Sequence, residues 1–238
     1  MQTPSYVALS SQAALSRQMD VVANNLANAS TAAYKAQRLV FSQYVVTADD
    51  GTTSFVYDAG TYRDPKQGAL KHTGNDLDVA IDGGGYLAVT TPDGERYTRN
   101  GHLKLGPDGT LVTTQGYQVE GDGGGAITLP AGTTGIVITQ DGTVSTKDGQ
   151  VGKIRLVSFP DDGQVESEAD GLYVTDETPT AATNATLRQG MIEESNVQPV
   201  VELTRLMSIS RSYEAVNGMI SGENDRIKNA IDKLSKVV

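Results

Sequence analysis

The first segment of the chain carries apolar residues at helical spacing. Thr3 and Pro4 precede them, and a threonine followed by a proline is typical of a helix start. We therefore predict a helix from residue 4 to about residue 28. Its apolar positions step by four, three and four residues, at Leu15, Met19, Val22 and Leu26.

The last segment carries a longer stripe of the same kind. Ser195, Asn196 and then Pro199 predict the place where its helix begins. From there to the last residue the helix would be about 60 Å long, at 1.5 Å per residue. A polar interruption falls at Glu223 and Asn224. The apolar positions, spaced three, four or seven residues apart, are Leu206, Ile209, Tyr213, Val216, Ile220, Ile227, Ile231 and Leu234.

Two arrangements of these helices agree with the pattern. Both helices can pack on a globular body, as amphipathic helices often do. Alternatively, they pack on each other in a coiled-coil-like manner and on copies of the same helices in neighbouring subunits. The length of the last helix favours the second arrangement, because about 60 Å exceeds the width of a small domain.

Between these ends the apolar period changes from helical to two. The alternation predicts short strands at residues 77–81, 86–89, 102–105, 136–138 and 154–157. Eight of the chain's nine Asp-Gly pairs lie between Asp82 and Gly171, and Asp-Gly favours tight hairpin turns. The middle is therefore predicted to be a mostly antiparallel β domain rich in hairpins, and the whole chain to be an α+β protein.

The pattern divides the chain into five segments. Residues 31–69 hold much of the aromatic content, which a flexible linker does not need, and we expect an extended or β-hairpin connector around Asp49-Asp50-Gly51. The predicted segments are an N-terminal helix at 1–30, this connector at 31–69, the β domain at 70–184, a return connector at 185–198 and a C-terminal helix at 199–238.

Three asparagines, Asn24, Asn25 and Asn28, fall at the end of the first apolar stripe. Asparagine is a poor helix former because its side chain competes for backbone hydrogen bonds. Either the helix ends there, or these amides meet something specific.

Composition limits the possible functions. A formal net charge of −10 argues against binding to nucleic acid and to anionic lipid. The absence of cysteine excludes disulfides and thiol chemistry. No apolar run is long enough to span a bilayer, and no cleavable signal peptide is apparent at the start of the sequence.

Candidate chemistry is weak throughout. His72 and His102 lie in polar contexts without clustered ligands, so surface histidines are favoured over a metal site. Asp76, Asp78 and Asp82 only loosely match a calcium-binding loop, and turn chemistry explains them better. No phosphate loop or nucleophile elbow occurs. We predict no catalytic residues, no bound metal and no cofactor.

Four blocks of sequence resemble the bacterial flagellar rod and hook proteins. The first is VVANNLANASTAAYK at residues 21–35, and the second is GALKHTGNDLDVAIDGGGYLAV at residues 68–89. The others are GERYTRNGHLKLGPDGTLVTTQGYQVEG at 94–121 and QGMIEESNVQPVVELTRLMSISRSYEAV at 189–216. They occur in the family's order over nearly the whole chain. Ala33 stands where the family resemblance leads us to expect glycine, and a positive φ there would be strained.

The resemblance implies a structural subunit of the flagellar basal-body rod. In such a subunit the terminal helices line the inner core of a helical tube that transmits torque, and the β domain lies outside. The implied partners are other copies, other rod proteins, the type III export apparatus and the surrounding ring proteins. The implied location is the rod crossing the periplasm, reached without a cleavable signal. The opening segment is more similar to a proximal-rod member than to a distal-rod member.

The resemblance and the helical stripes together predict an assembly interface. We expect the three asparagine amides to cap the helix end and to link it to adjacent chains, since a buried polar residue can fix register. The predicted interface residues are Leu15, Met19, Val22, Asn24, Asn25, Leu26, Asn28, Leu206, Ile209, Tyr213, Val216, Ile220, Ile227, Ile231 and Leu234.

Three alternatives stay open at this point. A distal-rod or hook-type subunit has the same general organisation. A non-flagellar surface β protein with a helical stalk would need a signal or an anchor. A carbohydrate-active enzyme would need a cleft with paired carboxylates.

Overall fold

A computed structural model describes residues 3–48, 51–130 and 132–235 of the chain. The chain forms two compact units. The helix–hairpin unit comprises residues 1–29, 36–64 and 197–238, and the β unit comprises residues 30–35 and 65–196. Two terminal helices and a central antiparallel β region make this an α+β protein, as the sequence predicts.

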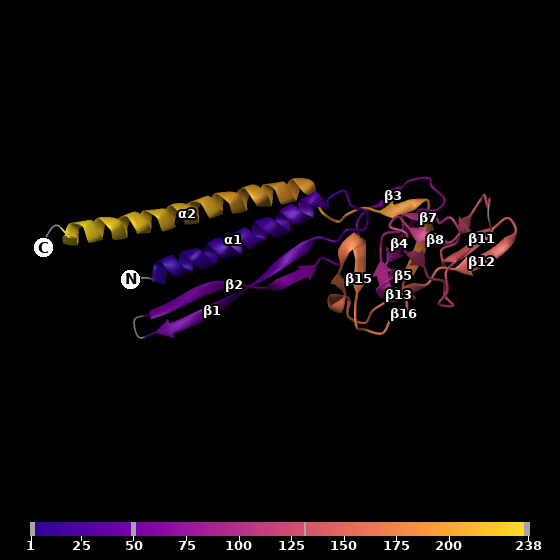
Figure 1. The fold of residues 1–238 in the computed structure, drawn as a ribbon, viewed down its shortest axis with the longest axis horizontal. Helices are drawn as coiled ribbons and strands as arrows, with labels where there is room; N and C mark the ends of the chain where they lie inside the picture. Colours follow the sequence, from indigo (N-terminus) through magenta and orange to yellow (C-terminus); the bar gives the residue numbers. More distant parts are fainter. Residues whose placement is uncertain (1–2, 49–50, 131, 236–238) are drawn as a thin grey trace. The chain divides into compact units, whose positions relative to one another are not determined.

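The helix–hairpin unit contains two helices and two long strands. These are α1 (Thr3–Ala27), α2 (Pro199–Ser235), β1 (Gln37–Ala48) and β2 (Gly51–Arg63). Helix α1 packs along α2 on one side and against the hairpin on the other (Figure 1). Both predicted helices are therefore present with nearly the predicted limits, and they lie side by side; the regular seam of a coiled coil stays a prediction.

Local chemistry explains where α1 ends and where α2 begins. The Asn28 side-chain amide donates to the carbonyl oxygen of Asn24 at 2.9 Å, which satisfies one of the last carbonyls of α1. Helix α2 begins with Pro199 at its first position, where the missing N–H costs nothing. The Glu202 N–H then bonds to the Gln198 carbonyl at 3.0 Å.

The predicted hairpin is present as β1 and β2, which pair in antiparallel register from Gln37↔Arg63 to Ala48↔Gly51. The register shifts once, between Val40 and Phe41. The predicted turn residues Asp49 and Asp50 lie outside the described residues. The hairpin groups with the helices in one compact unit, whereas the sequence analysis assigned it to a separate connector.

The β unit contains short antiparallel strands. Its largest sheet has the order β14-β15-β6-β5-β9-β8-β7, and β13 pairs with both β5 and β16. Smaller sheets pair β10-β11-β12, β17-β4 and β18-β3. Each of the five predicted strands overlaps an observed one, with limits that differ by up to two residues. The bounds are β3 (Leu70–His72), β4 (Val79–Gly83), β5 (Tyr86–Thr91), β6 (Gly94–Thr98), β7 (Leu103–Leu105), β8 (Leu111–Thr113), β9 (Gln118–Val119), β10 (Val137–Ile138), β11 (Thr143–Thr146), β12 (Gly149–Lys153), β13 (Leu156–Ser158), β14 (Glu166–Ser167), β15 (Leu172–Val174), β16 (Thr180–Ala181), β17 (Ala185–Gln189) and β18 (Met191–Glu193), with single 3₁₀ turns η1 (Asp162–Gln164) and η2 (Ala169–Gly171).

Asp-Gly pairs form tight turns between these strands, as predicted. Gly94 connects β5 to β6 with φ of 113°, and Gly149 connects β11 to β12 with φ of 130°. Such positive φ values favour glycine because it lacks a Cβ. The turn chemistry thus explains the succession of hairpins.

Two buried clusters hold the β unit together. The larger consists of aliphatic side chains from the strands and includes the fully buried Ile81, Leu87 and Val89. The smaller is aromatic: Tyr86, Tyr97 and Tyr173 pack with Phe159, with ring centroids 4.8 to 5.7 Å apart. The β unit therefore covers its own core.

Candidate assembly surfaces

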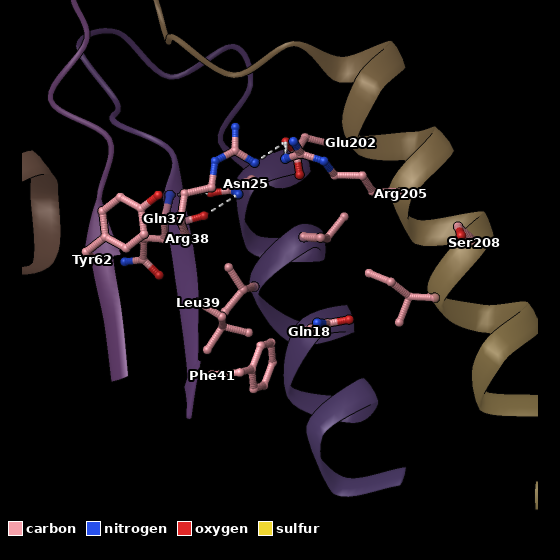
Figure 2. Close-up of a pocket in the computed structure, with 13 residues that line it drawn as sticks. Gln18, Asn25, Gln37, Arg38, Leu39, Phe41, Tyr62, Glu202, Arg205 and Ser208 are labelled. Atoms are coloured by element: carbon pink, nitrogen blue, oxygen red, sulfur yellow. Dashed lines mark hydrogen bonds and ion pairs between the residues drawn. The ribbon is translucent and has the colours of Figure 1, made fainter. Parts of the chain in front are cut away.

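A groove lies within the helix–hairpin unit where α1, α2 and β1 meet (Figure 2). Its volume is about 410 Å³. Apolar side chains from all three elements line the groove together with polar and charged ones. The lining residues are Gln18, Val21, Val22, Asn25, Gln37, Arg38, Leu39, Phe41, Tyr62, Glu202, Arg205, Ser208 and Ile209.

Asn25 ties the end of α1 to the beginning of β1. Its Nδ2 donates to the Gln37 carbonyl oxygen at 2.9 Å, and its Oδ1 accepts from the Gln37 N–H at 2.8 Å. The side chain thus pairs with the strand much as a neighbouring strand would, and the residue is fully buried. This explains one asparagine of the cluster by a contact inside the chain, and its predicted link to an adjacent chain stays a prediction.

Glu202 joins α2 to the hairpin at the same end of the groove. Its Oε1 accepts from Arg38 Nη1 and from Arg205 Nη1, both at 2.8 Å (Figure 2). The Glu202 side chain is 1% exposed, and its Oε2 has no hydrogen-bond partner among the described residues. Two guanidinium groups therefore share one carboxylate oxygen, which fixes the start of α2 against β1.

The apolar stripe of α2 divides into two parts. Its first part is half-buried in the unit, with Leu206, Ile209, Tyr213, Val216 and Ile220. Further along, Ile227 is 43% exposed and Ile231 is 59% exposed. Helix α2 has 37 residues and α1 has 25, and the stripe is exposed over its last turns. Helix α1 therefore covers only part of the apolar stripe of α2.

The polar interruption in this stripe is an ion pair along α2. Arg226 Nε donates to Glu223 Oε2 at 2.8 Å, and this hydrogen bond lowers the pKa of the Glu223 carboxyl. The pair separates the half-buried part of the stripe from the exposed part.

A second exposed apolar face begins at the start of α2. Val200, Leu203 and Met207 are spaced three and four residues apart, so they share one side of the helix. All three are exposed, and Val200 is 76% exposed. The interface predicted from the sequence did not include these residues, although their spacing alone would have indicated a second stripe.

The remaining predicted interface residues take mixed positions. Val22 is buried, Leu15, Met19 and Leu26 are half-buried, and Asn24 is exposed. Asn28 is half-buried and caps its own helix. The side chain of Leu234 lies outside the described residues. Whether this set contacts neighbouring subunits stays a prediction.

The sequence analysis missed the charged residues that organise the groove. Arg38 and Glu202 are 164 positions apart, and no local periodicity connects them. Leu39 and Phe41 lie in the segment 31–69, which the sequence analysis interpreted only as an extended or hairpin connector. Long-range pairs of this kind become visible only once the chain is folded.

Other candidate sites carry little chemistry. His102 Nδ1 lies 2.5 Å from Asp78 Oδ1, so this histidine pairs with a carboxylate on a neighbouring loop. Within the described ranges, no cluster of three or more His, Cys, Asp or Glu side chains is arranged to hold a metal ion. Neither α1 nor α2, as far as the structure describes them, is long and apolar enough to cross a membrane.

Comparison with known protein families gives three matches along the chain. The family described as flagella basal body rod protein matches residues 6–35, and the flagellar hook protein FlgE/F/G D1 domain matches residues 80–146. The flagellar basal body rod FlgEFG protein C-terminal family matches residues 188–233. The three matches cover α1, much of the β unit and α2.

Comparison with curated proteins extends this likeness over the whole chain. The flagellar basal-body rod protein FlgF of Caulobacter vibrioides is 40% identical over 239 residues, covering 98% of both chains. The chain belongs to the flagellar basal-body rod protein family. The FlgF of Mesorhizobium japonicum is 36% identical, covering 90% of both chains, whereas the FlgG of Caulobacter vibrioides is 32% identical, covering 95% of this chain and 97% of its own.

Family membership confirms the resemblance that the sequence analysis identified. The greater identity to FlgF than to FlgG within one organism also agrees with the order of similarity that the opening segment indicated. The family consists of structural rod proteins rather than enzymes, which confirms the prediction that the chain is not an enzyme.

Proposed function

We propose that this chain is a structural subunit of the flagellar basal-body rod, which assembles helically through its helix–hairpin unit and transmits torque along the rod. The proposal rests on family membership and on one structural observation, the distribution of uncovered apolar side chains. We place the subunit in the part of the rod that crosses the periplasm.

The uncovered apolar side chains concentrate in the helix–hairpin unit. Among side chains that the structure describes, twelve large apolar ones are exposed, and eleven of them belong to this unit. Large contiguous apolar patches on a soluble protein usually mark interaction sites. A head-to-tail arrangement of such surfaces produces a filament when the rotation does not close.

Three surfaces would then contact neighbouring subunits. They are the last turns of α2 around Ile227 and Ile231, the outer face at Val200, Leu203 and Met207, and the groove rim at Leu39 and Phe41. The stripe predicted from the sequence contributes through its exposed end, while its half-buried residues position α2 on α1. Neighbouring copies and other rod proteins are the partners that these surfaces suit.

Delivery to the rod is part of the proposal. We infer that the chain is exported by the flagellar type III apparatus without a cleavable signal, and that its helices order fully only on assembly. Helices with one uncovered face are weak in isolation, since most helical stability comes from packing. The formal net charge of −10 argues against nucleic acid as a partner.

A matched pair of variants tests the assembly surface. The double variant Ile227→Ser/Ile231→Ser removes two exposed apolar side chains from α2, and Val137→Ser removes one that is 53% exposed on the β unit. We expect the double variant to be exported and folded but to give non-motile cells whose basal bodies lack hooks. The Val137→Ser cells should swim normally.

The measurement is motility in soft agar together with electron microscopy of purified basal bodies. Normal rods from the double variant would refute assembly through the end of α2. Loss of rods from the Val137→Ser variant alone would indicate that the assembly interface lies on the β unit.

A distal-rod role is the second candidate, because the FlgG relative covers 95% of this chain at 32% identity. Complementation separates the two candidates. We expect this chain to restore motility to a strain that lacks FlgF and not to a strain that lacks FlgG.

A further inference from the structure

A cluster of three charged side chains is buried inside the β unit. Glu193 Oε1 accepts from Lys35 Nζ at 2.5 Å, and Glu193 Oε2 accepts from Arg99 Nε at 3.0 Å. Arg99 Nη2 lies 2.9 Å from the same oxygen. The three side chains are 3%, 6% and 0% exposed for Lys35, Arg99 and Glu193. Burial of charges is costly unless every group is paired, so this arrangement has strict geometry.

The cluster also binds the backbone of residues 66–68, a third segment beside those that carry Lys35 and Glu193. Lys35 Nζ donates to the carbonyl oxygen of Lys66 at 2.8 Å. The N–H of Gly68 donates to Glu193 Oε1 at 2.9 Å. A Cβ placed on Gly68 would lie 1.9 Å from a neighbouring backbone carbonyl oxygen, so these segments approach more closely than any side chain permits.

Backbone hydrogen bonds join the same three segments. The Ala33 N–H donates to the Glu193 carbonyl oxygen at 2.8 Å, and the Asn196 N–H donates to the Tyr34 carbonyl oxygen at 3.2 Å. The Asn196 side-chain amide donates to the Lys66 carbonyl oxygen at 2.9 Å. Segments around residues 34, 67 and 194 are thus cross-linked to one another at one place.

Arg99 attaches these cross-linked segments to the β sheet. Its Nη1 donates to the Gly85 carbonyl oxygen at 2.6 Å, and its Nη2 donates to the Gly83 carbonyl oxygen at 3.1 Å. Both glycines flank the turn that leads into β5, and β5 carries the core residues Leu87 and Val89. The cluster is therefore fixed to the most buried part of the unit.

These three segments are the ones through which the chain enters and leaves the β unit. The chain passes between the two units four times, at 29/30, 35/36, 64/65 and 196/197. Residues 30–35 carry two of these passages, and residues 65–68 and 193–196 carry one each. We propose that Lys35, Arg99 and Glu193 form a clamp that holds all four passages to the β unit as a single attachment.

The backbone at Ala33 supports this inference. Ala33 has φ of 58°, a left-handed conformation that costs a residue with a Cβ some free energy. Strained residues persist where the surroundings determine their conformation. The hydrogen bond from Ala33 to Glu193, and the neighbouring Lys35 in the cluster, supply that constraint.

The clamp has a mechanical consequence, which rests on the proposed function. A rod subunit under torque exchanges force between its two units through the four chain passages. If the passages are bound to one another, they move together, and no single passage is pulled from the sheet edge first. Lys35, Arg99 and Glu193 are positioning residues in this sense.

Lys35→Met is the variant that tests the clamp. Methionine keeps a long unbranched side chain, and its introduction leaves Arg99 and Glu193 as a charge-balanced pair. Lys71→Met is the matched control, because Lys71 pairs with Glu194 at 3.2 Å on the adjacent strand pair while the two side chains are 63% and 46% exposed.

The measurement is residue-resolved amide hydrogen exchange on the full-length monomer. In Lys35→Met we expect the N–H groups of Ala33, Gly68 and Asn196 to exchange about tenfold faster or more, by a common factor, as one cooperative unit opens. The Leu111 N–H, which bonds to Ile127 in the core, should keep its wild-type rate. Lys71→Met should change none of these four rates.

Three results would overturn the clamp. They are wild-type rates at all three of these N–H groups, acceleration at Ala33 alone, and an equal acceleration at Leu111, which would mean that the cluster holds the whole fold. A separate arm tests the mechanical consequence by comparing swimming speeds in media of increasing viscosity. Joint release in the monomer together with wild-type speed at every viscosity would keep the clamp and refute its role in torque.

Discussion

The two units of this chain bury their apolar residues in opposite ways. In the β unit, Ile81, Leu87 and Val89 are fully buried, and one large apolar side chain among those described, Val137, is exposed. In the helix–hairpin unit the buried apolar residues among the described side chains are few and mostly small, and exposed apolar residues lie along α2. The β unit covers its apolar core within the single chain, whereas the helix–hairpin unit leaves apolar side chains exposed.

This contrast separates folding from assembly. Burying apolar area stabilises a fold by about 25 cal/mol per Å², so a unit with a covered core is stable alone. A helix whose outer face stays in water gains much less. The same chain can therefore carry a stable body and helices that gain most of their stability from neighbouring subunits.

The largest expected effect tests this contrast directly. Leu87→Ala should destabilise the monomer by about 2–5 kcal/mol, because it removes buried methyl groups and leaves a cavity. Ile231→Ala should change the stability of the monomer by less than about 0.5 kcal/mol, because that side chain is 59% exposed. Urea denaturation monitored by circular dichroism measures both. Equal destabilisation by the two variants would contradict the difference in apolar burial between the β unit and the helix–hairpin unit.

The second effect concerns how α2 is held within its own unit. Glu202→Gln removes the charge that Arg38 and Arg205 share, so two guanidinium groups remain close together without a counter-ion. We expect a loss of about 1–2 kcal/mol, since charged hydrogen bonds are strong but both arginines are partly exposed. Thermal melting followed at the helical circular dichroism band measures it.

Glu223→Gln is the control for this variant. It breaks an exposed ion pair with Arg226 on the same helix, and such pairs contribute little. If both variants shift the helical transition equally, the Arg38–Glu202–Arg205 group does not anchor α2.

Much of the architecture follows from local patterns in the sequence. The stripes from Leu15 to Leu26 and from Leu206 to Ile231 predict α1 and α2, because helical period is a property of neighbouring residues. The Asp-Gly pairs predict the hairpins for the same reason, as at Gly94 and Gly149. Four family-like sequence blocks predict the class of function, and family membership confirms it.

The parts that sequence reasoning missed depend on contacts between distant residues. Lys35 and Glu193 are 158 positions apart, and Arg38 and Glu202 are 164 apart. A buried charged residue looks like a surface one until its partner is known. The asparagine cluster shows both cases: the pattern indicated that the amides matter, but only the fold shows that Asn25 binds the backbone of Gln37.

The third effect concerns that asparagine. Asn25→Ala leaves the buried N–H and carbonyl of Gln37 without their side-chain partner, so we expect a loss of about 1 kcal/mol confined to the helix–hairpin unit. Asn24→Ala, at an exposed position in the same turn, should have little effect. Amide exchange along β1 measures the difference, and equal protection in both variants would show that Asn25 does not hold the hairpin.

The smallest effect is a local response of the β unit to acid. Asp141 lies in the turn between β10 and β11, where its carboxylate oxygens accept hydrogen bonds from the hydroxyls of Thr139 and Thr143. The hydrogen bonds from Thr139 and then Thr143 lower the pKa of Asp141 from 3.8 to about 2. A lowered pKa means that the ionised group stabilises the folded turn above pH 3.8 and that this contribution is lost as the pH falls to about 2.

We therefore expect the amide signals of Thr139, Gly142 and Thr143 to shift between about pH 4 and pH 2 while the core signals stay fixed. Asp141→Asn should remove that titration, and Thr139→Val should move its midpoint up toward 3.8 because the strongest donor is lost. A midpoint that stays near 2 in Thr139→Val would mean that the hydroxyl does not hold the carboxylate. Core signals that titrate together with the turn would mean that the β unit is less self-contained than its buried core indicates, because a turn that opens on its own requires a sheet that stays closed without it.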